Sequence, residues 1–201
     1  MKQNSGQMLR AEELLSRFDP QTGTIEGCET ISRRLSDLHG LFVNQNAFET
    51  ALRVGDPVIY TVSSIQSAHG EGQLHCGLGV IMPGRIGNEY YFTRGHVHSW
   101  RNAAEFYVGL NGEGKMILEN EASHESVVLD LLLNSIVYVP GKTAHRTVNV
   151  GDTLLVYLGI YPAEAGHDYT GLAEHNFKQV IVAKNNKPAV VSRKDFLAVH
   201  K

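Results

Sequence analysis

The chain has 201 residues, of which 42% are hydrophobic and 19% charged, enough to bury a core within the size range of one domain. Its formal net charge is -3 and like charges do not gather in blocks, which argues against a broad surface for nucleic acid or for an anionic membrane. The chain has only two cysteines, no apolar signal segment and no apolar run long enough to span a bilayer, so we expect a soluble protein of the reducing cytoplasm.

The first part of the chain, residues 1–56, is expected to form a helical segment that packs on the rest. Between residues 7 and 18 apolar side chains recur at roughly helical spacing, and the Asp19-Pro20 pair then ends the pattern. A second short helix is expected after Thr30, whose hydroxyl can cap it, with Gly40 closing it.

From residue 57 onward, short runs rich in Val, Ile, Tyr and Leu alternate with Gly, Pro and Asn turns, which is typical of β-sheet. Hairpin loops are expected at residues 83–88 and 111–114, where Gly and Asn accept positive φ. Residues 57–184 are therefore predicted to form an antiparallel sandwich or barrel, followed by a surface strand or extended arm at 185–201, all in a single domain of residues 1–201. The expected strands are residues 58–64, 74–82, 90–93, 104–110, 115–119, 127–132, 136–139, 154–161 and 180–183.

A candidate metal site comes from three histidines and a glutamate. His96 and His98 are separated by one residue, so a strand would point both imidazoles to the same face. Glu105 begins the next predicted strand, and His145 follows a later one. This mixed nitrogen and oxygen ligand set suits iron, manganese, nickel or zinc better than calcium or magnesium. We therefore predict one divalent metal per chain.

The alternative is that these histidines are scattered by chance, since the chain has 10 of them. Besides the three candidate ligands and His167, the chain has six histidines that lack a partner at ligand spacing. We interpret these six as solvated or structural: His39, His69, His75, His124, His175 and His200. A lone His-x-His is only moderately specific. The glutamate and the later histidine that follow it favour the metal site.

The two segments resemble the two cupin motifs. The first has His-x-His, a glutamate and a later glycine, here Gly112, and the second has Pro140, His145 and Asn149. The interval between His98 and Glu105 is longer than in most cupins and matches a narrower group. PGRIGNEY at residues 83–90, TRGHVH at 93–98, YVPGKTAHRTVN at 138–149 and IYPAEAGHDY at 160–169 resemble the cupin-type glucose-6-phosphate isomerases of archaea and some bacteria. The resemblance covers roughly residues 74–182 and implies an all-β, jelly-roll-like cupin barrel, usually paired as a homodimer.

The resemblance also implies roles for individual residues. The family's metal ligands fall on His96, His98, Glu105 and His145, its catalytic positions on Glu105, His167 and Tyr169, and its substrate-binding positions on Thr93, Gly95, Tyr107 and Tyr161. Two positions depart from the pattern: Gly79 stands where a threonine that helps hold the phosphate is expected, and Lys142 stands where a tyrosine is common. We assign Lys142 to substrate binding, because its charge could compensate for the missing hydroxyl.

A regular strand would point Thr93 away from the face of His96, so a phosphate-binding role for Thr93 and Gly95 requires a kink at Gly95. Gly95 otherwise reads as a plain bulge or strand start, and Thr93 as a half-buried strand residue.

The implied reaction interconverts glucose 6-phosphate and fructose 6-phosphate in glycolysis and gluconeogenesis, with mannose 6-phosphate as a further possible substrate. A divalent cation, with Fe²⁺ expected and Mn²⁺, Ni²⁺ or Zn²⁺ as alternatives, would stabilise negative oxygen at C1 and C2. Glu105 would then transfer the proton; in a direct hydride shift it would serve only as a ligand. The competing hypotheses are an iron-dependent cupin dioxygenase and a non-catalytic module that binds a sugar phosphate.

Overall fold

The computed structural model describes residues 9, 14–66 and 68–199. Half of the helix expected at residues 7–18 lies outside the described residues, and Phe18 at its end instead begins a short strand, β1 (Phe18–Asp19), which pairs with β2 (Thr24–Ile25). In the part of the chain that the structure describes, no helix combines the length and the apolar character needed to cross a membrane.

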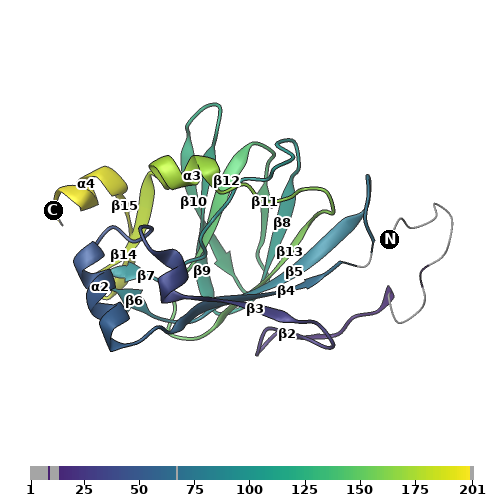
Figure 1. Cartoon of the computed structure of the whole chain (residues 1–201), viewed down its shortest axis with the longest axis horizontal. Coiled ribbons are helices and arrows are strands. Elements are labelled where there is room, and N and C mark those ends of the chain that lie inside the picture. The colour runs from purple at the N-terminus through teal and green to yellow at the C-terminus, as the bar shows by residue number, and fades with distance from the viewer. Residues whose placement is uncertain (1–8, 10–13, 67, 200–201) are drawn as a thin grey trace.

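The largest sheet provides one wall of the cavity that is described below. Among the described residues it has six strands in the order β11-β8-β13-β5-β4-β3, and neighbouring strands run antiparallel. Strands β3, β4 and β5 of this sheet run roughly along the long axis of the molecule (Figure 1). Its strands are β3 (Thr30–Arg34), β4 (Val58–Ile65), β5 (Leu74–Ile81), β8 (Glu105–Asn111), β11 (Ile136–Val139) and β13 (Leu155–Pro162).

Two smaller antiparallel sheets complete the described β-structure. One has the order β10-β9-β12 and the other the order β15-β14-β7-β6. Bridges from Phe92 to Val148 and from His96 to His145 add the segment 92–97 to the free edge of β12. The strands are β10 (Ser126–Leu132), β9 (Glu113–Asn120), β12 (Thr143–Asn149), β15 (Lys187–Ser192), β14 (Gln179–Lys184), β7 (Glu89–Tyr90) and β6 (Arg85–Ile86).

The main core fills the space between the six-stranded and three-stranded sheets. Ile81 and Leu155 of the first sheet and Met116 and Leu118 of the second are buried in one cluster. Alternate strand residues point inward, as they do when two antiparallel sheets face each other: Ile81 and Leu155 lie on the inner face of the first sheet, and Met116 and Leu118 lie on that of the second. The architecture confirms the prediction of an all-β, jelly-roll-like cupin barrel.

The helices lie at one end and along one edge of the sheets (Figure 1). The prediction of a helix after Thr30 was wrong for residues 30–34, because these residues pair with β4 as strand β3. Only the short 3₁₀-helix η1 (Leu35–Leu38) follows them. Helix α2 (Gln45–Val54) was not predicted, although Asn44 caps it: the Asn44 Oδ1 accepts a hydrogen bond from the Ala47 N–H at 2.9 Å. Two further short helices are α3 (Thr170–His175) and α4 (Arg193–Ala198).

Most predicted strands are present with slightly different ends, but some turns and strands were not as expected. Residues 111–114 do not form a hairpin loop, because β8 and β9 belong to different sheets and the chain turns a corner between them at Gly112, with a φ of 78°. The strand expected at 90–93 is reduced to the end of β7 and the bridge at Phe92. The expected arm after residue 184 pairs with β14 as strand β15.

Candidate metal centre and its cavity

The four predicted ligands come from three separate places in the chain and meet at one point. Glu105 is the first residue of β8, His145 lies in β12, and His96 is bridged to His145 across the edge of that strand. One ligand atom from each of His96, His98, Glu105 and His145 can be chosen so that all four lie within 4.8 Å of one another. The spacing argument from the sequence therefore placed these side chains correctly.

Backbone carbonyls fix the orientation of two of the imidazoles. The Nδ1 of His98 lies 3.2 Å from the Ala103 carbonyl oxygen, and the Nδ1 of His145 lies 3.2 Å from that of Thr143. The Nε2 atoms of both rings therefore face inward, each 3.2 Å from Oε2 of Glu105. A ring nitrogen that is held from outside by a carbonyl is the usual arrangement around a metal-binding histidine.

The protonation of these groups also suits a cation. Within the described residues, the buried Nε2 atom of His96 has no hydrogen-bond partner. Burial, with the neighbouring imidazoles of His145, His167 and His98, lowers the pKa of His96 well below its usual value. Burial alone would raise the pKa of Glu105, but hydrogen bonds and charge from His145 and His98 lower it to about 2. A neutral His96 imidazole beside an ionised Glu105 carboxylate is in the form that binds a divalent metal.

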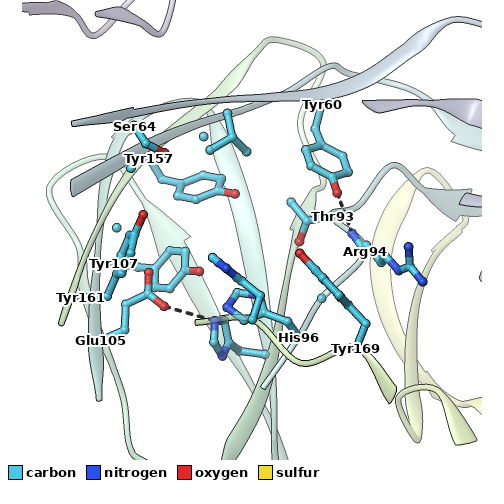
Figure 2. Close-up of a pocket in the computed structure, with 17 residues that line it drawn as sticks. Tyr60, Ser64, Thr93, Arg94, His96, Glu105, Tyr107, Tyr157, Tyr161 and Tyr169 are labelled. Carbon is cyan, nitrogen blue, oxygen red and sulfur yellow. Dashed lines mark hydrogen bonds and ion pairs between the residues drawn. The ribbon is translucent and has the colours of Figure 1, made fainter. Parts of the chain in front are cut away.

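A cavity opens above the metal centre between the two facing sheets (Figure 2). One wall consists of alternate residues from adjacent strands of the six-stranded sheet, and the other consists of segment 93–96, His145, His167 and Tyr169. The first wall contains Tyr60, Val62 and Ser64 of β4, Gly77 and Gly79 of β5, Glu105 and Tyr107 of β8, and Tyr157, Gly159 and Tyr161 of β13. The cavity is thus rich in hydroxyl groups, with the metal ligands at one end.

This cavity is lined by the aromatic side chains that the family resemblance had predicted. Tyr107 is buried beside Tyr157, with ring centroids 5.3 Å apart, and burial raises its pKa well above the usual value. The rings of His167 and Tyr169 are parallel within 8°, and the His167 ring centroid lies 4.3 Å from that of His96. Tyr161 lies on the opposite wall, 6.3 Å from His167 between centroids.

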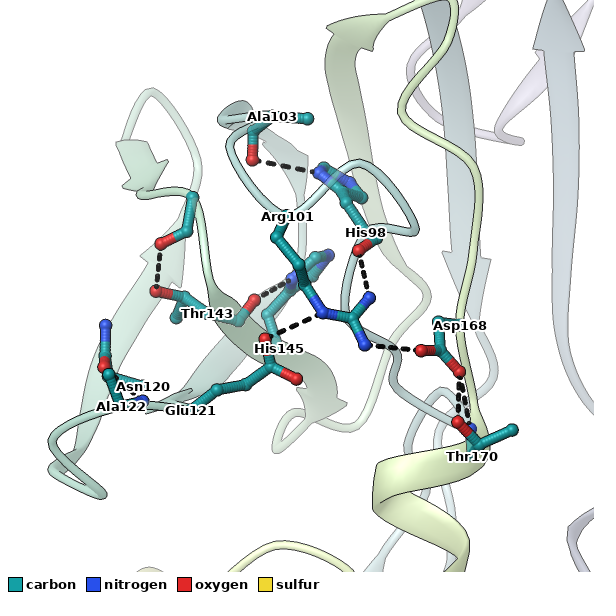
Figure 3. A network of polar contacts seen from close by, with 11 residues as sticks. His98, Arg101, Ala103, Asn120, Glu121, Ala122, Thr143, His145, Asp168 and Thr170 are labelled. Atoms are coloured by element: carbon teal, nitrogen blue, oxygen red, sulfur yellow. Dashed lines mark hydrogen bonds and ion pairs between the residues drawn. The ribbon is translucent and has the colours of Figure 1, made fainter.

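An arginine ties the metal-binding segment to the loop that carries His167 and Tyr169 (Figure 3). Arg101 donates from Nη1 to the His98 carbonyl oxygen at 2.5 Å and from Nη2 to the Asp168 carboxylate at 2.5 Å. Its Nε also lies 3.0 Å from a carboxylate oxygen of Glu121. Hydrogen bonds from Thr170 and Arg101 lower the pKa of Asp168, so its carboxylate stays charged in this network. The network holds the two loops in a fixed relation around the cavity.

The backbone bends at Gly95 as the phosphate-binding hypothesis requires. Gly95 has a φ of 77°, and a Cβ there would lie 2.6 Å from the Phe177 ring and 3.0 Å from the His145 carbonyl oxygen. The bend brings Thr93 and His96 to the same cavity. The hydroxyl oxygen of Thr93 accepts a hydrogen bond from the Thr147 N–H at 3.1 Å and keeps its own proton to donate.

We expect Gly95→Ala to destabilise the protein by more than the cost of the left-handed backbone, which is about 1–2 kcal/mol for a residue with a Cβ. Thermal unfolding should show a clear fall in the melting temperature. The matched control is Gly27→Ala, because Gly27 has a φ of 74° but no atom within 4 Å of the added Cβ. An equal loss in both variants would mean that the crowding around Gly95 does not constrain the loop.

The structure explains why residue 79 is a glycine, but it does not bring the side chain of Lys142 to the cavity. A Cβ at Gly79 would lie 2.3 Å from Cζ and 2.4 Å from the hydroxyl oxygen of Tyr157, so the Tyr157 ring occupies the place of any side chain there. Lys142 is exposed in the turn between β11 and β12 and is absent from the described residues that line the cavity. Its left-handed φ of 59° fits the turn. The structure therefore gives no support to the assignment of Lys142 to substrate binding, which stays a prediction.

Four polar side chains that line the cavity were not predicted, those of Tyr60, Ser64, Arg94 and Tyr157. Arg94 is exposed, and its guanidinium lies 4.8 Å from the centroid of the Tyr169 ring. The buried Arg146 supports this segment from behind, since its Nη2 donates to the Arg94 carbonyl oxygen at 2.7 Å. A cation two residues before the first ligand was the one available signal for Arg94, whereas the tyrosines are ordinary strand residues by sequence.

Comparison with known proteins identifies sequence relatives that agree with one another. The family model of glucose-6-phosphate isomerase matches residues 32–197. A glucose-6-phosphate isomerase of Pyrococcus abyssi is 40% identical over 180 residues, which cover 90% of this chain and 95% of that protein. One from Thermococcus litoralis is 41% identical over 174 residues, which cover 87% and 91%. A solved structure of oxalate oxidase is more distant, with a TM-score of 0.47 and 15% identity over 57% of this chain and 56% of that one.

Proposed function

The chain belongs to the glucose-6-phosphate isomerase family, and we propose that it interconverts glucose 6-phosphate and fructose 6-phosphate in the cavity above its metal centre. The observation that carries this proposal is the convergence of three imidazoles and one carboxylate at one end of a hydroxyl-rich cavity. The other end presents Thr93, Arg94 and Gly95, which suit an anionic group. The sugar would lie between these two ends.

When bound, a divalent cation supplies Lewis-acid polarisation of the two substrate oxygens at C1 and C2. His96, His98, Glu105 and His145 would hold it. We propose Fe²⁺ as the native ion. Mn²⁺, Ni²⁺ and Zn²⁺ are the alternatives, because all four ions accept imidazole and carboxylate ligands.

Glu105 has the position of a residue that both holds the metal and moves a proton. Its Oε2 faces the imidazoles of His98 and His145. Its Oε1 lies on the side of Gly159, a residue of the cavity wall, where an added Cβ would approach it to 2.6 Å. We propose that this second oxygen moves the proton between C2 and C1. A direct hydride shift needs no base, so isotope exchange distinguishes the two mechanisms.

His167 and Tyr169 are proposed to act on the sugar from the opposite wall. Burial lowers the pKa of His167, which keeps the imidazole neutral near pH 7 and able both to accept and to donate a proton. Tyr107 and Tyr161 would orient the hydroxyl groups of the open-chain sugar, and Thr93 with the Gly95 N–H would bind its phosphate.

The test is a coupled assay that detects fructose 6-phosphate formed from glucose 6-phosphate, run beside an oxygen electrode. We expect isomerisation without oxygen uptake. Oxygen consumption without isomerisation would favour a dioxygenase, and tight binding of glucose 6-phosphate by metal-loaded protein without turnover would favour a non-catalytic binding module.

We also propose that the protein is a cytoplasmic homodimer. The outer faces of β8 and β11 expose large apolar side chains, with Phe106 47%, Ile136 68% and Tyr138 52% exposed, which supports pairing with a second copy. Cys28 and Cys76 are free thiols, which suits a reducing compartment. Sedimentation equilibrium and cell fractionation test these two points.

A further inference from the structure

Tyr157 and Gly79 form a complementary pair on neighbouring strands. They are direct partners in the register of β13 and β5. The Tyr157 ring lies across Gly79 so closely that even a Cβ at that residue would come within 2.4 Å of the Tyr157 hydroxyl oxygen. Gly79 therefore has no side chain to offer the cavity, and the phenol of Tyr157 takes its place on this wall.

The hydroxyl of Tyr157 belongs to the end of the cavity that contains Thr93. Figure 2 shows it pointing away from β13 toward the side where Thr93 and Tyr60 lie. Thr147 links the two hydroxyls, because its N–H donates to Thr93 Oγ1 at 3.1 Å and its side chain hydrogen-bonds to Tyr157. The Tyr60 hydroxyl, at the same end, lies 3.5 Å from the Arg94 N–H. Three hydroxyl groups thus gather beside the bend at Gly95.

The Tyr157 hydroxyl remains protonated throughout the pH range in which the protein would work. Burial raises its pKa, the hydrogen bond with Thr147 opposes this, and the nearby Tyr60 and Glu105 raise it further. A neutral phenol can donate one hydrogen bond, and a donor aimed at an anion forms a stronger bond than one between neutral groups. A phosphate monoester, which presents three acceptor oxygens, fits a cluster of hydroxyl donors beside a backbone N–H and a cation.

We propose that Tyr157 is a substrate-binding residue whose hydroxyl donates to the phosphate group, in the position that a side chain at residue 79 would otherwise occupy. The assignment rests on the proposed function for the identity of the substrate. The recognition of phosphate itself does not depend on turnover and can be measured separately.

The test is Tyr157→Phe, which removes only the hydroxyl and leaves the ring that fills the space over Gly79. We expect the KM for glucose 6-phosphate to rise about tenfold or more while kcat stays within roughly twofold. The dissociation constant of inorganic phosphate, measured by calorimetry on the metal-loaded protein, should rise by a similar factor. Metal content and melting temperature should not change.

Tyr91→Phe is the matched control, because Tyr91 lies outside the described lining of the cavity and the substitution keeps the ring that lies beside Gly84. It should leave KM and phosphate affinity unchanged. An unaltered phosphate dissociation constant in Tyr157→Phe would overturn the inference, as would a fall in kcat alone. If the unsubstituted protein binds phosphate through Tyr157 but shows no isomerisation, the proposed function fails while this inference stands.

Discussion

The His145→Ala variant is expected to lose its bound metal and its isomerase activity together. His145 is only 2% exposed, its Nδ1 is held by the Thr143 carbonyl, and its Nε2 is one of four ligand atoms at the centre. Alanine removes one of the three imidazoles and leaves a polar void. Water can fill this void, but it does not replace the imidazole as a ligand. Metal content by plasma mass spectrometry and the coupled assay should both fall close to background.

The control for this variant is His124→Asn. His124 is exposed in the turn after β9 with a φ of 58°, a conformation that asparagine also adopts. It should keep full metal content and activity. A His145→Ala protein that retained one metal per chain would show that the remaining three residues suffice, and the four-ligand description would be incorrect.

The second large effect is expected from Glu105→Gln. The substitution keeps the size of the side chain and one oxygen that can still face the metal, but it removes the charge and the ability to accept a proton. We expect the metal to remain and kcat to fall by about 10²–10⁴, the usual contribution of general acid–base catalysis. Steady-state kinetics on the metal-loaded variant measures this.

Isotope exchange separates the two roles of Glu105. If its carboxylate transfers the proton, the product formed in D₂O should carry deuterium from solvent, and the variant should lose this exchange with the activity. Full activity in Glu105→Gln, or conversion in D₂O without any incorporation, would remove Glu105 as the base and favour a direct hydride shift.

The sequence predicted those parts of the fold in which local pattern and tertiary environment agree. Strands β4, β5 and β13 consist of β-branched and apolar residues between turns, so they were found almost at their full length. Strand β12 was not, because it consists of TAHRTVN and all seven of its residues are buried. Its polar side chains are bonded to cavity and core groups, which removes the alternation on which strand prediction depends.

His96 and His98 could be placed together because their spacing is a local property, whereas the positions of Glu105, His145 and the rest of the cavity depend on pairing across the chain. His96 and His98 share a face on any extended segment. The presence of Tyr60 and Tyr157 in the same cavity follows only from the order β13-β5-β4 in the six-stranded sheet. Lys142 shows the limit of reasoning from proximity in sequence: it is close to His145 in the chain, but the turn that contains it lies outside the described lining of the cavity.

The most direct test of the central claim is a titration of chelator-stripped protein with Fe²⁺, repeated with Mn²⁺, Ni²⁺ and Zn²⁺, while isomerase activity is followed. The four convergent ligands predict that activity is absent at the start, rises linearly, and reaches a plateau at one ion per chain. Full activity in protein shown to be free of metal would contradict the account.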